Sequence, residues 1–328
     1  MIIHFHFHSR ATGITRTVES IVPILNKYSG SFVFGYGIKA PKISWISLLR
    51  LIYSDRKLVI HTHRDIEILF ALFLRKMRGK FKLIFTRHSD GKPAKLSCLL
   101  MKKADHLVTL NSTMAENIPY PNTLIKHGVN IDIFKIHKKQ KIANIHQKNL
   151  ISIIGRIRPP KGQIVVLRAL TAILRNNSDW GLVMIGKIDD KKYAEEIMSM
   201  ASENGIASQV YIMPESNKII DYYFASNIIV IASFTEGFSL VCLEAMACGL
   251  ITVATESVGI HSKVINHGEN GFLFPKNDHE YLRKILTDII SGKINLDPDK
   301  IRQTVIDKWS LERSVKDLLK LYEISQVN

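Results

Sequence analysis

Residues 232–250 read ASFTEGFSLVCLEAMACGL and follow an apolar run, NIIVI (227–231), that predicts a buried strand. The loop FTEG then leads into a short predicted helix, FSLVCLEAMACG, for which Gly249 is a natural stop. A strand, a loop and a helix in this order form the repeating unit of parallel α/β sheets. Glu236 lies in the loop, and Glu244 lies about two turns inside the helix.

The first turn of this helix is predicted to contain Gly237, Phe238, Ser239 and Leu240. Free backbone N–H groups and the positive end of the helix dipole suit a phosphate or a sugar hydroxyl. A carboxylate would repel phosphate, but its two acceptor oxygens suit vicinal hydroxyl groups. The two glutamates therefore indicate a nucleotide-sugar site, with Glu236 on the transferred sugar and Glu244 on the ribose. On spacing alone, a capping acid and a solvated helix residue remain the alternative.

The same alternation of apolar strands and helical patterns occurs on both sides of a polar, basic stretch, KIHKKQKIANIHQKN (135–149). We therefore predict an α/β protein with two doubly wound parallel-sheet domains and a cleft between them. The predicted parts are a basic first domain (1–135), a linker (136–148), a second domain (149–308) and a C-terminal helix (309–328). The candidate strands are 2–7, 31–34, 57–60, 81–86, 106–109 and 123–126, and then 150–154, 182–185, 210–212, 228–231 and 251–253.

The basic charge is confined to the first half of the sequence. Residues 1–150 hold 25 lysines and arginines against 8 acidic residues, whereas residues 151–328 hold 20 against 21. Such asymmetry indicates an anionic partner, which could be nucleic acid, phospholipid headgroups or an acidic substrate. The three cysteines form no metal-ligand spacing, and neither a secretory signal nor an 18-residue apolar run is present, so we expect a cytoplasmic protein.

The segment EGFSLVCLEAMACG resembles the E-x7-E donor signature of the retaining glycosyltransferases of family 4, which have the GT-B fold. Further motifs are similar to this family and occur in the family's order. They are HGVNIDIF (127–134), GRIRPPKG (155–162), VMIG (183–186), NHGENGFLF (266–274) and the closing WSLERSVKDLLKLYE (309–323). The resemblance implies two Rossmann-like domains that face each other across a cleft, with the C-terminal helix crossing back to the first domain. It also implies that the first domain (1–135) binds the acceptor and the second (149–308) binds the nucleotide-sugar donor.

The resemblance also implies roles for individual residues. Arg156 and Lys161, in a loop that begins with Gly155, would hold the diphosphate and stabilise it as it leaves, in place of a metal. Gly186 belongs to the same donor site. His88 occupies the position of a family histidine that contacts the donor sugar, and Gly13 matches one glycine of the turn that approaches the donor. Where the family commonly has Gly-Gly-x-Pro-Glu, this chain has GIHSK (259–263), so no contact is carried over there.

The family transfers a sugar from a nucleotide donor with retention at the anomeric carbon, and the leaving phosphate takes the proton of the acceptor. No other cofactor is implied. Arg10 and Arg16 are candidates for binding an acidic acceptor. The segment HSRATGITRTVESIVPIL (8–25) resembles, more weakly, mannosyltransferases of the lipopolysaccharide inner core. We therefore predict transfer of mannose from GDP-mannose to an anionic glycolipid such as the Kdo region, by a protein peripheral to the inner membrane face.

Two alternatives remain. One is a family 4 enzyme that uses a UDP-hexose or a UDP-N-acetylhexosamine on another polysaccharide precursor. The other is a basic nucleic-acid-binding protein, which would not need the donor motifs and for which no aromatic RNA-binding motif is present. The alternation His4, His6, His8 places three histidines along one face of a strand, too collinear to bind one ion, so no metal site is expected.

Overall fold

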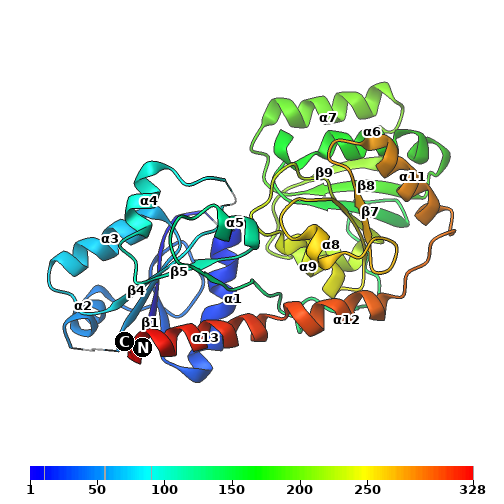
Figure 1. Cartoon of the computed structure of the whole chain (residues 1–328). Helices are drawn as coiled ribbons and strands as arrows, with labels where there is room; N and C mark the ends of the chain where they lie inside the picture. Colours follow the sequence, from blue (N-terminus) through cyan, green and yellow to red (C-terminus); the bar gives the residue numbers. More distant parts are fainter. Residues whose placement is uncertain (11, 55–56, 90, 328) are drawn as a thin grey trace. The chain divides into compact units, whose positions relative to one another are not determined.

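The computed structural model describes residues 1–10, 12–54, 57–89 and 91–327, which form two compact units (Figure 1). The first unit contains Met1–Asn130 and Trp309–Asn328, and the second contains Ile131–Lys308. Each unit has a parallel sheet of six strands covered by helices, so the predicted α/β class with two doubly wound sheets is confirmed.

The first sheet has the strand order β2-β1-β3-β4-β5-β6, and every pairing is parallel. β1 lies between β2 and β3, and it pairs in register with both, so that His4 lies beside His61. The bounds are β1 (Ile2–Phe7), β2 (Ser31–Tyr36), β3 (Val59–Thr62), β4 (Lys82–Thr86), β5 (His106–Thr109) and β6 (Thr123–Leu124).

Two apolar layers cover the two faces of this sheet, because alternate strand residues point to opposite sides. On one face α1 and α13 pack on a layer that includes Ile2, Val33 and Val59. On the other face α2, α3 and α4 pack on a layer that includes Ile3 and Phe5. The helices are α1 (Gly13–Tyr28), α2 (Trp45–Ser54), α3 (Asp65–Lys76), α4 (Lys95–Met101), α5 (Ser112–Glu116) and α13 (Leu311–Val327).

The C-terminal helix α13 is part of the first unit although it follows the second unit in sequence. Its buried residues Leu311, Val315, Leu318 and Tyr322 recur at a helical period and pack with α1. Its start is fixed by backbone bonds in which Val129 N donates to Trp309 O and Leu311 N donates to Val129 O. The predicted return of the last helix to the first domain is thus confirmed.

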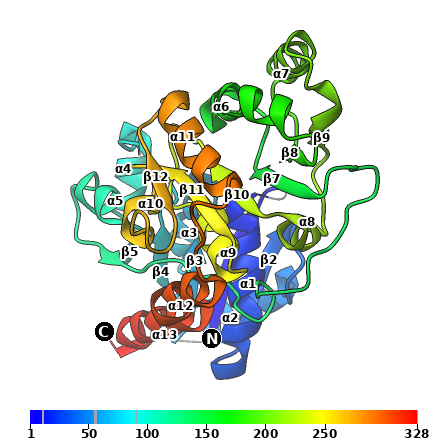
Figure 2. The same cartoon turned by 90° about the vertical axis from the view of Figure 1, so that its right-hand side faces the viewer.

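The second sheet has the order β12-β11-β10-β7-β8-β9, again all parallel (Figure 2). The chain runs outward from β7 to β9 and then returns to β10 on the other side of β7. This arrangement makes the β7–β10 boundary a topological switch point, where ligands of open α/β sheets bind. The bounds are β7 (Asn149–Ile154), β8 (Trp180–Ile185), β9 (Val210–Met213), β10 (Ile228–Ile231), β11 (Ile251–Thr255) and β12 (Phe272–Phe274).

Helices α6, α7 and α11 pack on one face of the second sheet. On the other face, Ser152 of β7 contacts Ser226 at the end of α8, and the buried side chains of α9 lie there as well. The helices are α6 (Gln163–Asn176), α7 (Lys191–Glu203), α8 (Ile219–Ala225), α9 (Leu240–Ala247), α10 (His261–Val264), α11 (His279–Ile290) and α12 (Pro298–Trp309). The stretch 136–148 contains no helix or strand and belongs to the second unit.

Candidate functional site

The candidate site is formed by two loops at the switch point of the second sheet. One loop follows β7 (155–162), and the other follows β10 (232–239). Phe234 N donates to Pro160 O at 2.9 Å, which joins the two loops directly. Gly162 is required at this contact, because a Cβ there would lie 2.1 Å from Ala232 O.

The two predicted glycines Gly155 and Gly186 are neighbours at the ends of β7 and β8. Gly155 N donates to Ile185 O at 2.9 Å, and a Cβ on Gly186 would lie 2.1 Å from Gly155 O. Both glycines have positive φ, 150° and 156°. Close packing of the backbone therefore requires glycine at 186, and the positive φ favours glycine at both positions.

Lys161 and Glu236, predicted separately as a phosphate ligand and a sugar ligand, contact each other in the structure. Lys161 Nζ donates to Glu236 Oε1 at 2.5 Å, and Ser233 Oγ donates to the same oxygen at 2.8 Å. Both charged side chains are mostly buried, with 19% and 16% of their surface exposed. The pair holds a cation and a carboxylate in fixed positions on the two adjoining loops.

Arg156 is held on the other side of the β7 loop by an acidic residue that the sequence analysis did not identify. Its Nη1 donates to Asp189 Oδ2 at 3.0 Å, and Lys187 Nζ lies 3.7 Å from Asp189 Oδ1. The pKa of the Asp189 carboxyl is lowered: partial burial alone would raise it, but the hydrogen bond and charge of Arg156 outweigh that effect. Asp189 therefore stays ionised and positions the guanidinium.

The helix after β10 begins later than predicted. α9 starts at Leu240, so Gly237, Phe238 and Ser239 precede the helix and do not form its first turn. The physical reason is Ser239, the N-cap residue, whose φ of 85° and ψ of 70° lie in the left-handed region. A left-handed residue interrupts the series of helical dihedrals, and serine adopts it at an energetic cost that glycine would not have.

Glu244 lies in the middle of α9 and is almost fully buried, with 8% exposure. The Tyr223 hydroxyl, from α8, donates a short hydrogen bond to Glu244 Oε2. The alternative of a solvated helix residue is therefore wrong for this position, since a buried carboxylate needs partners that compensate for lost hydration. The interaction between Glu244 and Tyr223 fixes the direction of one carboxylate oxygen.

His261 is a site residue that the sequence analysis missed. It is fully buried, its Nδ1 donates to Thr255 O at 2.8 Å, and its Nε2 lies 2.9 Å from Ser239 Oγ. Since a carbonyl only accepts, Nδ1 carries the proton and Nε2 accepts from the Ser239 hydroxyl. Burial lowers the pKa of His261 and favours this neutral form. The available signal was the histidine in GIHSK (259–263), where the resemblance breaks down.

The remaining predicted residues belong to the first unit. His88, just after β4, is partly buried; its Nε2 lies 3.1 Å from His63 Nδ1, and its Nδ1 lies 3.4 Å from His127 Nε2. Burial, followed by the charges of His127 and Arg64, lowers the pKa of His88 well below its usual range. His88 is therefore a neutral imidazole near pH 7.

Gly13 is the first residue of α1, and a Cβ there would meet no atom within 4 Å. Packing within the described residues therefore does not require glycine at this position. Arg10 is exposed in the loop before α1, and Arg16 is partly buried in its first turn. Ala11, in the same predicted loop, lies outside the described residues.

Comparisons with known proteins agree with this arrangement. The family model of glycosyl transferases group 1 matches residues 134–306, more than half of the chain. The lipopolysaccharide core biosynthesis mannosyltransferase LpsB of Rhizobium meliloti is 28% identical over 293 residues, covering 84% of this chain and 83% of that protein. The corresponding mannosyltransferase LpcC of Rhizobium leguminosarum bv. viciae is 25% identical over 303 residues, covering 88% and 86%.

Among solved structures, HepE of Anabaena in complex with UDP and glucose superposes with a TM-score of 0.80 at 14% identity. The superposition covers 98% of this chain and 99% of HepE, and it confirms the predicted GT-B class of fold. The order of motifs in the sequence, the paired loops at the switch point and the family match all lead to one assignment: the chain belongs to the glycosyl transferases group 1 family.

Proposed function

We propose that this glycosyltransferase moves a hexose from a nucleotide sugar, with mannose from GDP-mannose as the first choice, onto an anionic membrane glycolipid such as the Kdo region of the lipopolysaccharide inner core. The observation that carries the donor part is the Lys161–Glu236 pair on the two loops at the switch point. Two relatives that cover most of the chain are lipopolysaccharide core mannosyltransferases, which supports the choice of sugar and acceptor.

In this proposal the donor separates the two members of the ion pair. The diphosphate takes over Lys161 as its partner, because two phosphates compete well for a cation that has one carboxylate contact. Glu236, still held by Ser233, then accepts hydrogen bonds from hydroxyl groups of the transferred sugar. Glu244, directed by Tyr223, takes the corresponding role toward the ribose.

The chemical step proposed is same-face substitution at the anomeric carbon. The acceptor oxygen forms a bond to that carbon, the bond to the diphosphate oxygen breaks, and the acceptor proton passes to the leaving diphosphate. Lys161 and Arg156 stabilise the negative charge that develops on the leaving group, so the transfer needs no metal. The protein contributes position and electrostatic stabilisation, with His88 as the proposed contact to the donor sugar.

The acceptor part of the proposal is supported by exposed apolar and basic side chains on and next to α2, α3 and α4, helices of the first unit that Figure 1 shows as ribbons. Ring contacts of Trp45 with Phe70, and a hydrogen bond of Ser97 with Asp65, hold the three helices together. No helix among the described residues is long and apolar enough to cross a bilayer. This interfacial surface exposes Trp45, Ile46, Tyr53, Ile66, Leu69, Phe73, Met77, Leu96 and Leu99 together with Arg50, Lys76, Arg78, Lys80, Lys92, Lys95, Lys102 and Lys103.

Lipid headgroups and acyl chains match such a surface, because apolar side chains enter the interface while lysine and arginine bind anionic headgroups. An acidic glycolipid embedded in the same membrane would then be presented to the first unit. We therefore propose peripheral attachment to an anionic membrane face as the way in which the acceptor is reached.

The experiment that tests the function is transfer from a donor panel to a Kdo-containing lipid acceptor in anionic mixed micelles, in the presence of a chelator. The expected result is transfer from GDP-mannose with an α-linked product, identified by the anomeric coupling in NMR spectra. Lys161→Ala should abolish most transfer, and Lys284→Ala, an exposed lysine on α11, should not change it. Transfer from UDP-sugars alone would overturn the mannose assignment, and no turnover with any donor would overturn the proposal as a whole.

A further inference from the structure

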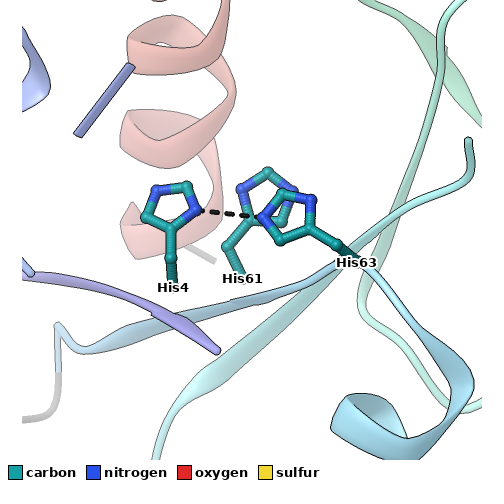
Figure 3. A group of neighbouring side chains, drawn as sticks. All are labelled: His4, His61 and His63. Carbon is teal, nitrogen blue, oxygen red and sulfur yellow. Dashed lines mark hydrogen bonds between the residues drawn. The ribbon is translucent and has the colours of Figure 1, made fainter. Parts of the chain in front are cut away.

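Three buried histidines gather on one face of the first sheet, and one of them, His63, contacts His88, the proposed contact to the donor sugar. His4 on β1 and His61 on β3 are register partners, and His63 follows His61 by two residues on the same face. Their exposed fractions are 0%, 1% and 4%. Figure 3 shows the three rings turned toward one another, with His4 and His63 joined by a hydrogen bond.

One pair of ring nitrogens already has the spacing of two ligands of one ion, and the third ring lies close to it. His4 Nδ1 lies 3.1 Å from His63 Nε2, and one nitrogen from each of the three rings can be chosen so that all lie within 4.8 Å of one another. Two nitrogens bound to a tetrahedral Zn²⁺ at about 2.0 Å lie about 3.3 Å apart. The farther nitrogens would have to approach by up to about 1.5 Å to place one ion within bonding distance of all three.

We propose that His4, His61 and His63 bind a divalent transition-metal ion, with Zn²⁺ as the reference ion. Three imidazoles favour zinc, copper, nickel or iron over magnesium or calcium, which require oxygen ligands. The collinear set His4, His6 and His8 is not the site: His6 contacts Tyr36 O and Thr15 instead, and His8 contacts Arg10 O. The three ligands come from β1 and from the neighbouring β3 with the residue that follows it, and not from β1 alone.

The protonation states fit this role, because a metal binds only the neutral imidazole. Burial lowers the pKa of His4 to about 3 and also lowers the pKa values of His61 and His63, the latter two helped by neighbouring histidines. When His63 binds through Nε2, its single proton resides on Nδ1 and is donated to His88 Nε2, 3.1 Å away. A ligand histidine typically donates its second N–H in this way.

His61 and His4 differ in what binding requires of them. His61 Nδ1 lies 2.7 Å from the Tyr322 hydroxyl, and its Nε2 lies 2.7 Å from Thr86 Oγ1. One of these bonds must give way to the ion, and the other then orients the ring. His4 Nε2 is buried with no hydrogen-bond partner among the described residues, so no partner there fixes the proton and Nδ1 is available to the ion.

An ion at this position would have two effects within the first unit. It would join β1 to β3 at the centre of the sheet, and it would fix the tautomer of His88. Because His63 must then donate to His88 Nε2, the proton of His88 lies on Nδ1, toward His127. The ion would have no role at the diphosphate, for which Lys161 and Arg156 are proposed.

The test is titration of the full-length protein, prepared without a histidine tag and stripped with chelator, with Co²⁺ and Zn²⁺. We expect one equivalent of Co²⁺ to bind and to produce the visible absorption bands of four-coordinate cobalt. Zn²⁺ should displace the Co²⁺ and raise the melting temperature of the protein. His63→Gln and His4→Gln should each weaken binding by at least about 100-fold, since outer partners alone contribute about 10- to 100-fold.

The matched control is the double variant His137→Gln, His146→Gln, which removes two exposed histidines of the second unit and should bind like the unmodified protein. If a variant at His4 fails to fold, X-ray absorption of the zinc-loaded unmodified protein still decides. Three imidazole ligands per zinc support the site. Zinc held by fewer imidazoles, binding that survives His63→Gln, or binding lost in the control variant would overturn it.

Discussion

Lys161 and Glu236 form an ion pair, so each neutralises the charge of the other. A lysine without a partner in a mostly buried loop would lose hydration without compensation, and so would a lone glutamate. The pair keeps both groups charged and in position. Under the proposed function, donor binding exchanges the partner of Lys161 from carboxylate to diphosphate, which costs less than burying a new charge.

We expect Lys161→Ala to lower kcat/KM by about 100-fold or more, because it removes a preorganised cation from the leaving group. The melting temperature should fall as well, because the substitution leaves the mostly buried Glu236 carboxylate without its cation. Steady-state kinetics with calorimetry measures both quantities. Lys284→Ala, on the exposed side of α11, is the control. Unchanged kcat/KM in Lys161→Ala would show that this residue does not bind the diphosphate.

The second residue prediction concerns His261, whose Nε2 accepts a hydrogen bond from the hydroxyl of Ser239, the residue just before α9. His261→Ala should lower the free energy of unfolding by about 2 kcal/mol, because it leaves a buried hydroxyl unpaired and opens a cavity. The KM for the donor should rise, since Ser239 and the loop before it would lose their anchor.

A double-mutant cycle of His261→Ala with Ser239→Ala distinguishes this contact from general packing. Residues in direct contact are expected to be non-additive by at least about 0.5 kcal/mol. Urea unfolding of the four proteins provides the four free energies. Strict additivity would mean that the hydrogen bond contributes nothing to stability.

At the scale of elements, strands could be predicted where a short apolar run is bounded by polar or turn residues. Elements without such a local pattern could not. The runs at 2–7, 106–109 and 228–231 were predicted with the observed bounds. β12 was not predicted as a strand, because three residues carry no periodic pattern. The start of α9 was placed too early, because the left-handed dihedrals of Ser239 are set by tertiary contacts and not by a glycine.

The residues of the candidate site likewise divide into those that local motifs identify and those that they do not. The carboxylates and cations of the loops could be identified from motifs, because each motif is local in sequence. The partners Asp189, Tyr223 and His261 could not, since each comes from another segment that only the sheet order brings near. The cluster of His4, His61 and His63 depends likewise on β1 lying beside β3, a neighbour relation that no spacing in the sequence shows.

The prediction at this scale concerns Gly128, where the backbone approaches the start of α13. A Cβ on Gly128 would lie 2.2 Å from Ser310 O, which is a backbone atom and not the end of a flexible side chain. Gly128→Ala should therefore force the two segments apart and destabilise the first unit by about 3 kcal/mol or more. Thermal unfolding measures the loss, and Gly292→Ala, where the new Cβ meets no atom within 4 Å, is the comparison. Equal melting temperatures for the two variants would contradict this view of the contact.

Gly292 has its own constraint, because its φ of 76° is left-handed and alanine there is strained by about 1 kcal/mol. The comparison thus separates two costs that glycine avoids. One is the strain of a single residue, and the other is the collision of two chain segments. The difference between the two variants reports the second cost.

At the scale of the whole molecule, the net charge of +16 comes from the first half of the sequence, and the interfacial surface on α2, α3 and α4 lies there. We expect flotation with vesicles that contain anionic phospholipid, and loss of binding as salt rises, because each lysine near such a surface contributes about 1 kcal/mol. Trp45→Ala with Phe73→Ala should weaken binding while leaving the salt dependence in place. Equal binding to neutral vesicles would contradict the electrostatic part.

The pH dependence of stability provides another whole-molecule prediction. Burial lowers the pKa of His127 to about 4, whereas its value in the unfolded chain is 6.5. Between these values the unfolded chain binds a proton that the folded chain excludes, so stability is complete above pH 6.5 and falls as the pH drops toward 4. The slope from this residue is up to about 1.4 kcal/mol per pH unit.

Urea unfolding at pH 7, 6 and 5, in chelator, measures this slope. His127→Gln should reduce it, and His146→Gln, at an exposed position, should leave it unchanged. If the unmodified protein and His127→Gln lose stability in parallel, the acid sensitivity belongs to other groups.

The first unit is assembled from two separate parts of the chain, residues before 131 and residues after 308, whereas the second unit is continuous. During synthesis the second unit can therefore complete its sheet while the first still lacks α13. Until then the apolar surface of α1 lacks the α13 side chains that cover it, and His61 lacks its partner Tyr322. The unit that begins to be synthesised first can therefore complete its fold only after the whole of the other unit has been translated.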